Sequence, residues 1–356
     1  MDILEKINKG RFSLPIIIKI ANKHNIPYLL NNTYSGSCAV LMFEKGNFAV
    51  WDTPFNINQV GSIKICSNKD ICTSFLERIG FSTPKSINYT RETTKNNDSL
   101  YEPMLNLFKN VGKNGFNYPL IIKPSTLSQG IGITKVNNYE EAREAIKISL
   151  QSNSRTFVIQ EYIEGNDFRI VVLGDKVIQA YKRVPFHIVG DGTHTIEELL
   201  DTKVKEFIEN DRDKKIDKND ERIIKCIKDK GYKLDSILEE NKILNLQNIA
   251  NLSLGGTSVD YTNEITPFFK NMVVAVAKSL NLDMCGIDII TTSISDPNNK
   301  SYKILEVNSA PGLDNYLYDD ELEQEKYVEK LYEQVILYVR NKVNNKENNI
   351  TKSKRI

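Results

Sequence analysis

The chain has 356 residues, of which 40% are hydrophobic, and this is enough for two or three domains with cores of ordinary size. Lysine and arginine total 47 and aspartate and glutamate total 46, so the formal net charge is +1. Because the sequence has neither an overall excess nor a long run of basic residues, we expect no nucleic acid as a partner.

The first part of the chain, residues 1–66, reads as a small α/β domain. Two apolar patches, at 38–43 and 47–51, are separated by a turn-like segment around Gly46. Such short alternating pieces are typical of a small domain that mixes helix and strand.

A helix is predicted next, within a central linker and helical part that we place at 67–117. Asn68 suits the N-cap position and Gly80 suits the stop. Between them apolar residues recur every four positions, at Ile71, Phe75 and Ile79.

Strand patterns dominate the segment 118–184. Asn138 and Glu141 have the spacing of a capping box and predict one helix, and Gly174-Asp175 predicts a two-residue hairpin. The predicted strands cover residues 118–123, 133–136, 156–160, 168–174 and 176–184. The unit is therefore expected to be mostly antiparallel.

A C-terminal domain is expected over 185–343. Its charged stretch carries three isoleucines at helical spacing, which favours a solvated amphipathic helix at Ile223, Ile224 and Ile227. Thr266 followed by Pro267 predicts the start of another helix.

The end of this domain is expected to hold two strands, at 284–290 and 302–308. A last helix is predicted from about residue 320. The polar tail 344–356 is expected to be disordered.

Several classes of protein are disfavoured by what the sequence lacks. No segment approaches the roughly 20 apolar residues of a membrane-spanning helix, and the N-terminus lacks the core of a signal peptide. The five cysteines are odd in number and form no Cys-x-x-Cys pair, as in cytoplasmic proteins with reduced thiols. The three scattered histidines disfavour a histidine-based zinc site or a Ser-His-Asp hydrolase. We expect a cytoplasmic protein with no membrane partner.

Three oxygen donors stand out in the last two strands. Asp288 interrupts an apolar strand, where a carboxylate is costly unless it is paired or binds a metal. Glu306 and Asn308 are two residues apart, so both side chains lie on one face of the next strand. These donors suit magnesium held together with nucleotide phosphates. An aspartate capping a turn and an asparagine ending a strand explain the spacing equally well.

A glycine-bearing loop at 125–132 is the second signal. It runs from strand to strand and lacks the Gly-Lys-Ser/Thr ending of a P-loop. Gly130 and Gly132 would let backbone N–H groups approach an anion, and Lys123 would add a charge. Taken alone, the pattern is more typical of an ordinary hairpin turn.

Arg169 and Arg183 lie within predicted strands, where arginines usually reach out to solvent. Between a phosphate loop and a metal site they would instead suit a transferring phosphoryl group. The segment 251–260 offers a glycine pair, which is either a plain turn or a set of backbone donors for a substrate oxygen.

In order and spacing, these motifs resemble the ATP-grasp fold. The resemblance is nearest to the ATP-grasp portions of cyanophycin synthetase and of the bifunctional bacterial glutathione synthase, and it covers about residues 67–340. It implies an α+β fold with mixed and antiparallel sheets and three subdomains. ATP would be held between a lid, formed by 118–184 with the glycine loop and the adenine hinge, and the C-terminal domain. The matching motifs are Lys123 with the glycine loop, QEYIEG at 160–165, RVPFHIVGDGTHTIEEL at 183–199, NLSLGGTSVD at 251–260, GIDII at 286–290 and LEVNSAPGL at 305–313.

The resemblance also implies roles for individual residues. ATP would be bound by two phosphate lysines, the glycine loop, the adenine hinge and a ribose position, which are Lys69, Lys123, Ser128, Gln129, Gly130, Gly132, Gln160, Glu161, Tyr162, Ile163 and Asp167. The implied metal ligands, for magnesium or manganese, are Asp288, Glu306 and Asn308. The residues implied to act near the γ-phosphate, the acyl-phosphate and the acceptor are Arg169, Arg183, Asn251, Gly255 and Gly256. Leu254 departs from the threonine frequent in these families.

The implied activity is that of an ATP-dependent carboxylate–amine ligase. ATP phosphorylates a carboxylate of an amino acid or short peptide, and an amine then attacks the acyl-phosphate. The chain shows neither the second ligase module of cyanophycin synthetase nor the glutamate–cysteine ligase module of the glutathione enzyme, so we expect a stand-alone ligase. The sequence leaves open a homo-oligomer, and two alternative functions: a non-catalytic ATP-binding module that serves a partner, and an ATP-grasp kinase of a non-carboxylate acceptor.

Overall fold

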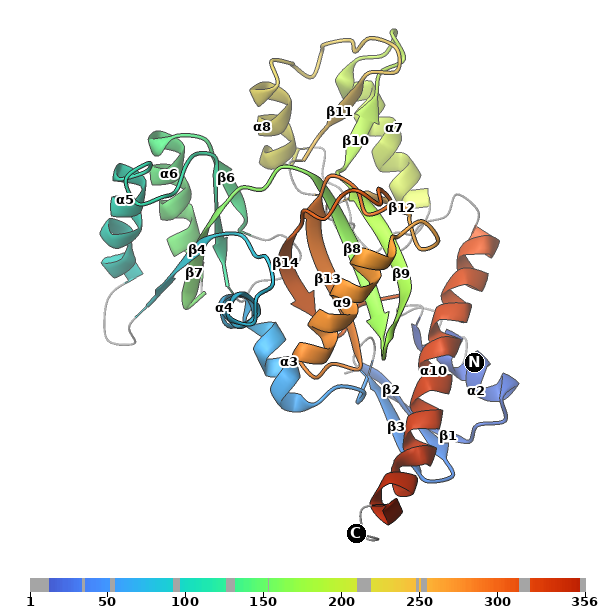
Figure 1. Cartoon of the computed structure of the whole chain (residues 1–356). Helices are drawn as coiled ribbons and strands as arrows, with labels where there is room; N and C mark the ends of the chain where they lie inside the picture. The colour runs from blue at the N-terminus through green and yellow to red at the C-terminus, as the bar shows by residue number, and fades with distance from the viewer. Residues whose placement is uncertain are drawn as a thin grey trace.

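A computed structural model describes residues 13–33, 36–51, 55–91, 97–125, 132–152, 154–209, 219–247, 250, 255–313 and 321–352. Its strands form a five-stranded sheet flanked by smaller sheets of four, three and two strands (Figure 1). Among these described residues, no helix combines the length and apolar character needed to traverse a bilayer.

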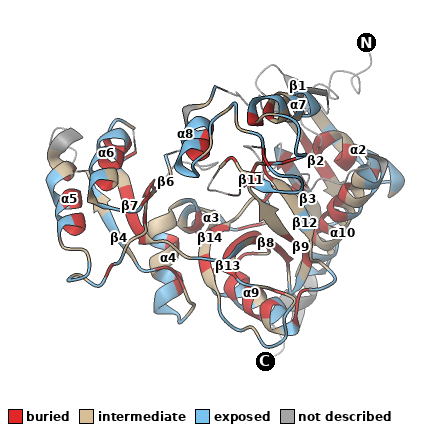
Figure 2. Cartoon of the chain, turned by 90° about the horizontal axis from the view of Figure 1, so that it is seen from above, coloured by how far each residue is buried: buried red, intermediate tan, exposed pale blue. Residues whose placement is uncertain are grey.

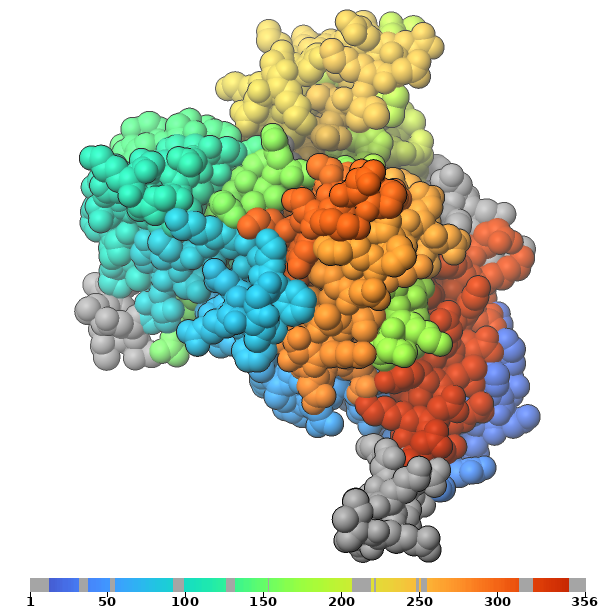
Figure 3. Space-filling view, in the orientation of Figure 1, coloured from blue at the N-terminus to red at the C-terminus, as the bar shows by residue number. Residues whose placement is uncertain are grey.

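The N-terminal unit is a three-stranded antiparallel sheet in the order β1-β2-β3. Its elements are α2 (Ser13–Lys23), β1 (Tyr28–Thr33), β2 (Gly36–Phe43) and β3 (Gly46–Trp51). The long C-terminal helix α10 (Glu321–Lys352) runs beside it (Figures 1 and 3). Ion pairs join the two helices, with Lys23 Nζ 3.0 Å from Glu333 Oε1 and Lys19 Nζ 2.8 Å from Glu329 Oε2. The two ends of the chain therefore build one unit.

The four-stranded sheet has the order β4-β7-β5-β6. Helices α5 (Tyr101–Lys109) and α6 (Tyr139–Leu150) pack on one of its faces through an apolar cluster that includes Phe108, Ile122 and Phe157. The opposite face carries Lys123 and Gln160. The strands are β4 (Ser86–Thr90), β5 (Leu120–Pro124), β6 (Thr134–Val136) and β7 (Thr156–Glu161), and the 3-10 turn η1 (Asn97–Leu100) precedes α5.

The five-stranded sheet lies at the centre of the molecule, in the order β12-β9-β8-β13-β14, with antiparallel neighbours throughout. Helix α9 (Pro267–Ser279) packs on one face through residues such as Phe269, Phe168 and Ile287, and Figure 2 shows β8 and β13 mostly buried. The strands are β8 (Asn166–Leu173), β9 (Lys176–Val184), β12 (Thr257–Asp260), β13 (Met284–Thr291) and β14 (Lys303–Asn308).

Two helices connect the N-terminal unit to the rest of the chain. They are α3 (Val60–Ser67) and α4 (Lys69–Arg78), and both contact β14. A separate small lobe interrupts the C-terminal part and has its own apolar core. This lobe contains β10 (His187–Val189), α7 (Ile196–Glu209), α8 (Glu221–Asp229) and β11 (Ile243–Asn245).

Most of the predicted local elements are present. In the predicted capping box, Asn138 Oδ1 accepts a bond from the Glu141 N–H at 2.9 Å. Thr266 is the N-cap of α9, and Ile223 and Ile227 are buried while Ile224 is exposed.

The polar tail was predicted wrongly for residues 344–352, because α10 continues to Lys352, and residues 353–356 lie outside the described residues. The range 118–184 supplies strands to both the four-stranded and the five-stranded sheet, which its hairpin pattern does not reveal.

The stripe predicted for the helix after Asn68 also differs in the structure. Helix α4 is present, but Ile71 and Phe75 are 51% and 40% exposed. Its buried residues are Cys72 and Leu76, which pack beside β14 in the central core. The period of four was therefore correct for a helix but did not identify the buried face.

Candidate functional site

The central sheet carries a row of charged side chains on the face opposite α9. Register places Arg169 of β8 beside Asp288 of β13, and Asp288 beside Glu306 of β14. In the adjacent row Asp167 of β8 lies beside Arg183 of β9. Residues that face each other across strands, or lie two apart along one strand, share a face of the sheet. The strands thus bring together five predicted site residues that are far apart in the sequence.

Two arginines share the carboxylate of Asp288. Arg169 donates from Nε to Oδ1 and from Nη2 to Oδ2, the latter at 2.8 Å. Arg183 donates from Nη2 to the same Oδ2 at 2.8 Å and to Asp167 Oδ1 at 2.7 Å. Asp288 is only 2% exposed and Arg169 only 8%. Because bidentate pairs at low exposure are both strong and directional, this network fixes the position of each member.

Burial and charge act in opposite directions on the two aspartates. Burial alone would raise the pKa of Asp288, but the Arg169 and Arg183 guanidinium groups outweigh it and hold that pKa well below its usual range. Burial raises the pKa of Asp167 to about 6, because Asp288 adds to the effect of burial and Arg183 only partly opposes it. Asp288 is therefore firmly anionic, whereas Asp167 titrates nearer neutrality.

Glu306 lies at the accessible end of the charged row. Its side chain is 31% exposed, and Lys69 Nζ lies 3.0 Å from Oε2. Arg169 Nη2 lies 3.9 Å from its other oxygen. Lys69 is the first residue of α4, so this helix start is held against β14. Lys69, the predicted first phosphate lysine, is thus paired with Glu306, a predicted metal ligand.

The second predicted phosphate lysine lies on the four-stranded sheet. Lys123 is buried, and its Nζ donates to Gln160 Oε1 at 2.8 Å. Burial, with a smaller contribution from the Lys69 charge, lowers the pKa of Lys123 to about 8, and the Glu306 carboxylate partly opposes this shift. The influence of Lys69 and Glu306 on Lys123 indicates that α4, β14 and β5 bring these three charges into one region.

The predicted hinge continues from β7. Glu161 accepts a bond from the Lys85 N–H at 2.8 Å. Tyr162 lies beneath the Lys135 ammonium, which is 3.7 Å from the ring centroid. Ile163 follows directly and is half-buried. This segment links the four-stranded sheet to β8 of the central sheet.

The predicted metal ligands form a donor set of two carboxylates and one amide. Asn308 pairs with Gly286, one row from the Asp288–Glu306 pair and on the same face. Its Oδ1 accepts a bond from the Ala310 N–H at 3.0 Å. In the part of the chain that is described, no three His, Cys, Asp or Glu side chains form a cluster able to hold a metal. Hard oxygen donors nevertheless fit magnesium, which takes few protein ligands and keeps water and phosphate oxygens.

The remaining predicted residues lie at the margins of the described chain or outside it. Ser128, Gln129, Gly130 and Asn251 lie outside the described residues. Gly132 and Gly255 have φ of 76° and 94°, a conformation that favours glycine. Gly256 is buried directly before β12, whose first residue pairs with Val184 next to Arg183.

Three neighbours of the charged row were not predicted from the sequence. Tyr181 pairs with Arg169 and is buried, and Gln179 lies two residues further along β9 on the same face. Gly286 lies two residues before Asp288. Counting by two from Arg183 and from Asp288 would have found all three.

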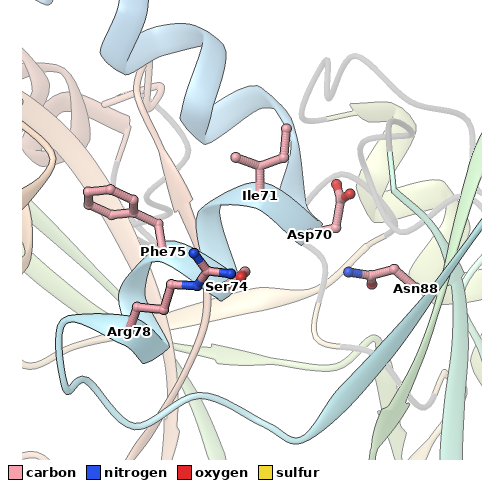
Figure 4. Close-up of a pocket in the computed structure, with 6 residues that line it drawn as sticks. All are labelled: Asp70, Ile71, Ser74, Phe75, Arg78 and Asn88. Carbon is pink, nitrogen blue, oxygen red and sulfur yellow. The ribbon is translucent and has the colours of Figure 1, made fainter.

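A pocket of about 330 Å³ lies between α4 and β4 (Figure 4). Ile71 and Phe75 line it from the helix, and Asn88 lines it from the strand. Asp70 also lines it and accepts a bond from Ser125 Oγ at 2.6 Å. The exposed stripe of α4 therefore borders this pocket, whereas the charged row lies on the central sheet.

Two known families match the chain. The family described as "D-ala D-ala ligase C-terminus" matches residues 75–252, which is half of the chain. The family described as "RimK-like ATP-grasp domain" matches residues 244–327. Together they include most of the four-stranded and five-stranded sheets.

Two curated relatives are similar to the chain over more than 250 residues each. Cyanophycin synthetase of Crocosphaera subtropica is 33% identical over 263 residues, which are 72% of this chain and 29% of the relative. The glutathione biosynthesis bifunctional protein GshAB of Pasteurella multocida is 29% identical over 259 residues, 69% of this chain and 32% of the relative. The chain thus spans about a third of the length of these relatives.

A solved structure has the same arrangement of elements. The bifunctional glutathione synthetase from Pasteurella multocida aligns with a TM-score of 0.53 and 24% sequence identity, over 84% of this chain and 40% of that chain. At this identity the likeness shows the fold.

Proposed function

The chain belongs to the ATP-grasp family, whose α+β fold it has, and on that premise we propose that it is an ATP-dependent carboxylate–amine ligase. Its substrates would be an amino acid or short peptide that supplies the carboxylate and a second small molecule that supplies the amine. The names of the curated relatives support this class of reaction.

The observation that carries the proposal is the buried row Arg183–Asp288–Arg169 with Glu306 at its end. Burying so many charges in a core is costly and seldom improves stability over apolar residues. Such a row suits a reaction that moves a highly charged phosphoryl group. It also lies beside two lysines, Lys69 and Lys123, that can bind phosphates.

In the proposed reaction the chain's residues bind and orient charge. Lys69 and Lys123 would hold ATP phosphates, and the segment Gln160–Ile163 would hold the adenine, with Asp167 at the ribose. A guanidinium has five N–H donors, and the contacts described use only Nε and Nη2 of Arg169 and Arg183. Donors therefore remain for the oxygens of the transferring phosphoryl group and of the acyl-phosphate.

Asp288, Glu306 and Asn308 would hold magnesium, or manganese in its place. When bound, the ion supplies positive charge that balances the phosphates. The acyl-phosphate must be shielded from water until the amine attacks it, because water would hydrolyse it. We assign this shielding to the four-stranded sheet with its glycine loop, and the acceptor contacts to Asn251, Gly255 and Gly256 beside β12.

This assignment divides the chain into functional parts. We propose a small N-terminal domain at 1–66, a linker at 67–117, a nucleotide-covering part within 118–184 and a C-terminal metal-bearing domain at 185–343. We also propose a cytoplasmic location, supported by five free cysteines.

The direct test is ADP release in the presence of magnesium, ATP and pairs of amino acids, with mass spectrometry of the product. Condensation loses water, whereas transfer to a non-carboxylate acceptor adds a phosphoryl group. Glu306→Gln should lower turnover by at least about 100-fold, because it removes a charged ligand at the reacting phosphates.

Glu323→Gln is the matched control, since Glu323 is 59% exposed and forms a surface ion pair with Lys326. Full activity of Glu306→Gln would contradict the metal assignment. Tight ATP binding without turnover on any carboxylate would instead support a non-catalytic nucleotide-binding module.

A further inference from the structure

Gly286 lies on the face of the central sheet that carries the charged row, next to two residues of the proposed site. It pairs with Val171 on one side and with Asn308 on the other, and it is two residues from Asp288. Its absent side chain would therefore point to the same face as Asp288. Gly286 is buried in the middle of a strand, where glycine is usually unfavourable.

The backbone does not explain this glycine. Its φ is not among the positive values that mark Gly165 and Gly174. It also pairs regularly with both neighbouring strands. A residue with a side chain could thus adopt this conformation, and the reason for glycine must be steric.

A Cβ at position 286 would be crowded from two sides. It would lie 2.8 Å from Arg169 Cδ and 3.0 Å from Pro311 Cβ. Carbon atoms at optimal separation are about 3.5–4.0 Å apart, so at least one neighbour would have to move.

Neither neighbour is free to move at low cost. The guanidinium of Arg169 is held by both oxygens of Asp288, and the side chain is 10% exposed. Pro311 is a ring fixed to the backbone, three residues after Asn308. Displacing Arg169 would loosen its pair with Asp288, and displacing Pro311 would shift the segment that follows Asn308.

We propose that Gly286 is a positioning residue that leaves room for the aliphatic stem of Arg169 to pass over it and reach Asp288 on the same strand. It thereby sets the geometry of the arginine pair and of the oxygen donors beside it. Its effect on nucleotide binding rests on the proposed function, whereas its effect on Arg169 does not.

The test is a double-mutant cycle on the full chain with Gly286→Ala, Arg169→Ala and the double variant. Urea unfolding without nucleotide gives the stability of each, and calorimetry with ATP and magnesium gives the dissociation constants. Gly61→Ala is the matched control, because a Cβ at Gly61 would meet nothing within 4 Å and its φ is not positive.

Gly286→Ala should lower the urea midpoint and raise the dissociation constant for ATP by about tenfold, the lower range of what overpacking a buried site costs. In the Arg169→Ala background the same substitution should change the dissociation constant by less than about twofold, because the Cδ contact is gone. Gly61→Ala should leave the dissociation constant unchanged and should not lower the urea midpoint, which alanine in a helix raises slightly if it changes it at all. Equal effects of Gly286→Ala in both backgrounds, or none in either, would overturn the proposal.

Two further outcomes keep the test decisive. Gly286→Ala could be insoluble. In that case a soluble double variant supports the proposal. An insoluble double variant, when Arg169→Ala alone is soluble, overturns it. If the wild-type chain does not bind ATP, the proposed function fails, and the stability cycle alone still decides the role of Gly286.

Discussion

The central sheet presents two regions on one face that differ completely in chemistry. At one end Val171, Leu173 and Met284 are buried against the N-terminal unit and α10, in a cluster that includes Leu331. One row along the same strands, the face holds Arg169, Asp288 and their charged neighbours. The strands, the face and the degree of burial are shared, and only the side chains differ.

This difference indicates that one end of the face contributes to stability and the other to the proposed function. The apolar end removes hydrocarbon from water and needs no specific geometry beyond close packing. The charged end depends on each ion finding its partner, since an unpaired buried charge is far more costly than a lost apolar contact. Substitutions at the two ends should therefore produce different kinds of loss.

The largest effect is expected for Asp288→Ala at the charged end. It leaves Arg169 and Arg183 buried without their shared partner, so the free energy of unfolding should fall by about 3–5 kcal/mol and ligase activity should be lost. Urea unfolding and ADP release measure the two effects. A stable, active variant would show that the row is dispensable.

A loss of stability without loss of binding is expected for Met284→Ala at the apolar end. Removing this buried side chain should lower the free energy of unfolding by about 2–4 kcal/mol. Its affinity for ATP, measured below the unfolding transition, should stay within about twofold of the wild type. A tenfold loss of affinity would mean that the two ends are not separable.

Lys123 allows a test by pH, because its pKa is lowered to about 8 by burial. Phosphate binding needs the protonated amine, so affinity for ATP should fall about tenfold as pH rises from about 7 to 9. Lys123→Arg should show a flatter profile, since guanidinium stays charged. A profile that is unchanged by the substitution would assign the titration to another group.

The ligand-free protein should respond to the same pH change in the opposite direction. Above about pH 8 the folded chain releases the Lys123 proton while the unfolded chain keeps it up to a pKa near 10.5. The unfolded state then binds more protons, so this group makes stability rise with pH in that window. Between pH 7.5 and 9.5 the Lys123 contribution should raise the urea midpoint of the wild type relative to that of Lys123→Met. Urea unfolding of both proteins at the two pH values measures this difference.

The smallest effect is expected for Gln179, which lies where the two regions meet. It is 1% exposed, and within the described ranges neither amide atom has a hydrogen-bond partner. Gln179→Leu should therefore raise the free energy of unfolding by about 1 kcal/mol. Gln179→Glu serves as the contrast and should lower it. Lower stability of the leucine variant would mean that the amide is paired after all.

Local elements were predictable because their signals lie within a few residues. The capping box at Asn138, the start of α9 at Thr266 and the hairpin at Gly174 depend on neighbouring backbone groups. The stripe Ile71–Phe75–Ile79 was predictable as a helix but not as an exposed face, because the buried face depends on contacts with β14. The extent of α10 was missed because its polar end lacks an apolar pattern.

By itself the sequence determined the strands within 118–184 and the last two strands, the two-residue spacing of Glu306 and Asn308, and the resemblance that the family matches confirm. Only the tertiary structure decided that Asp288 takes Arg169 and Arg183 as partners, that Lys69 reaches Glu306, and that Gly286 leaves room for an arginine stem. Pattern along a strand fixes which residues share a face, but register between strands distant in the sequence fixes which of them touch.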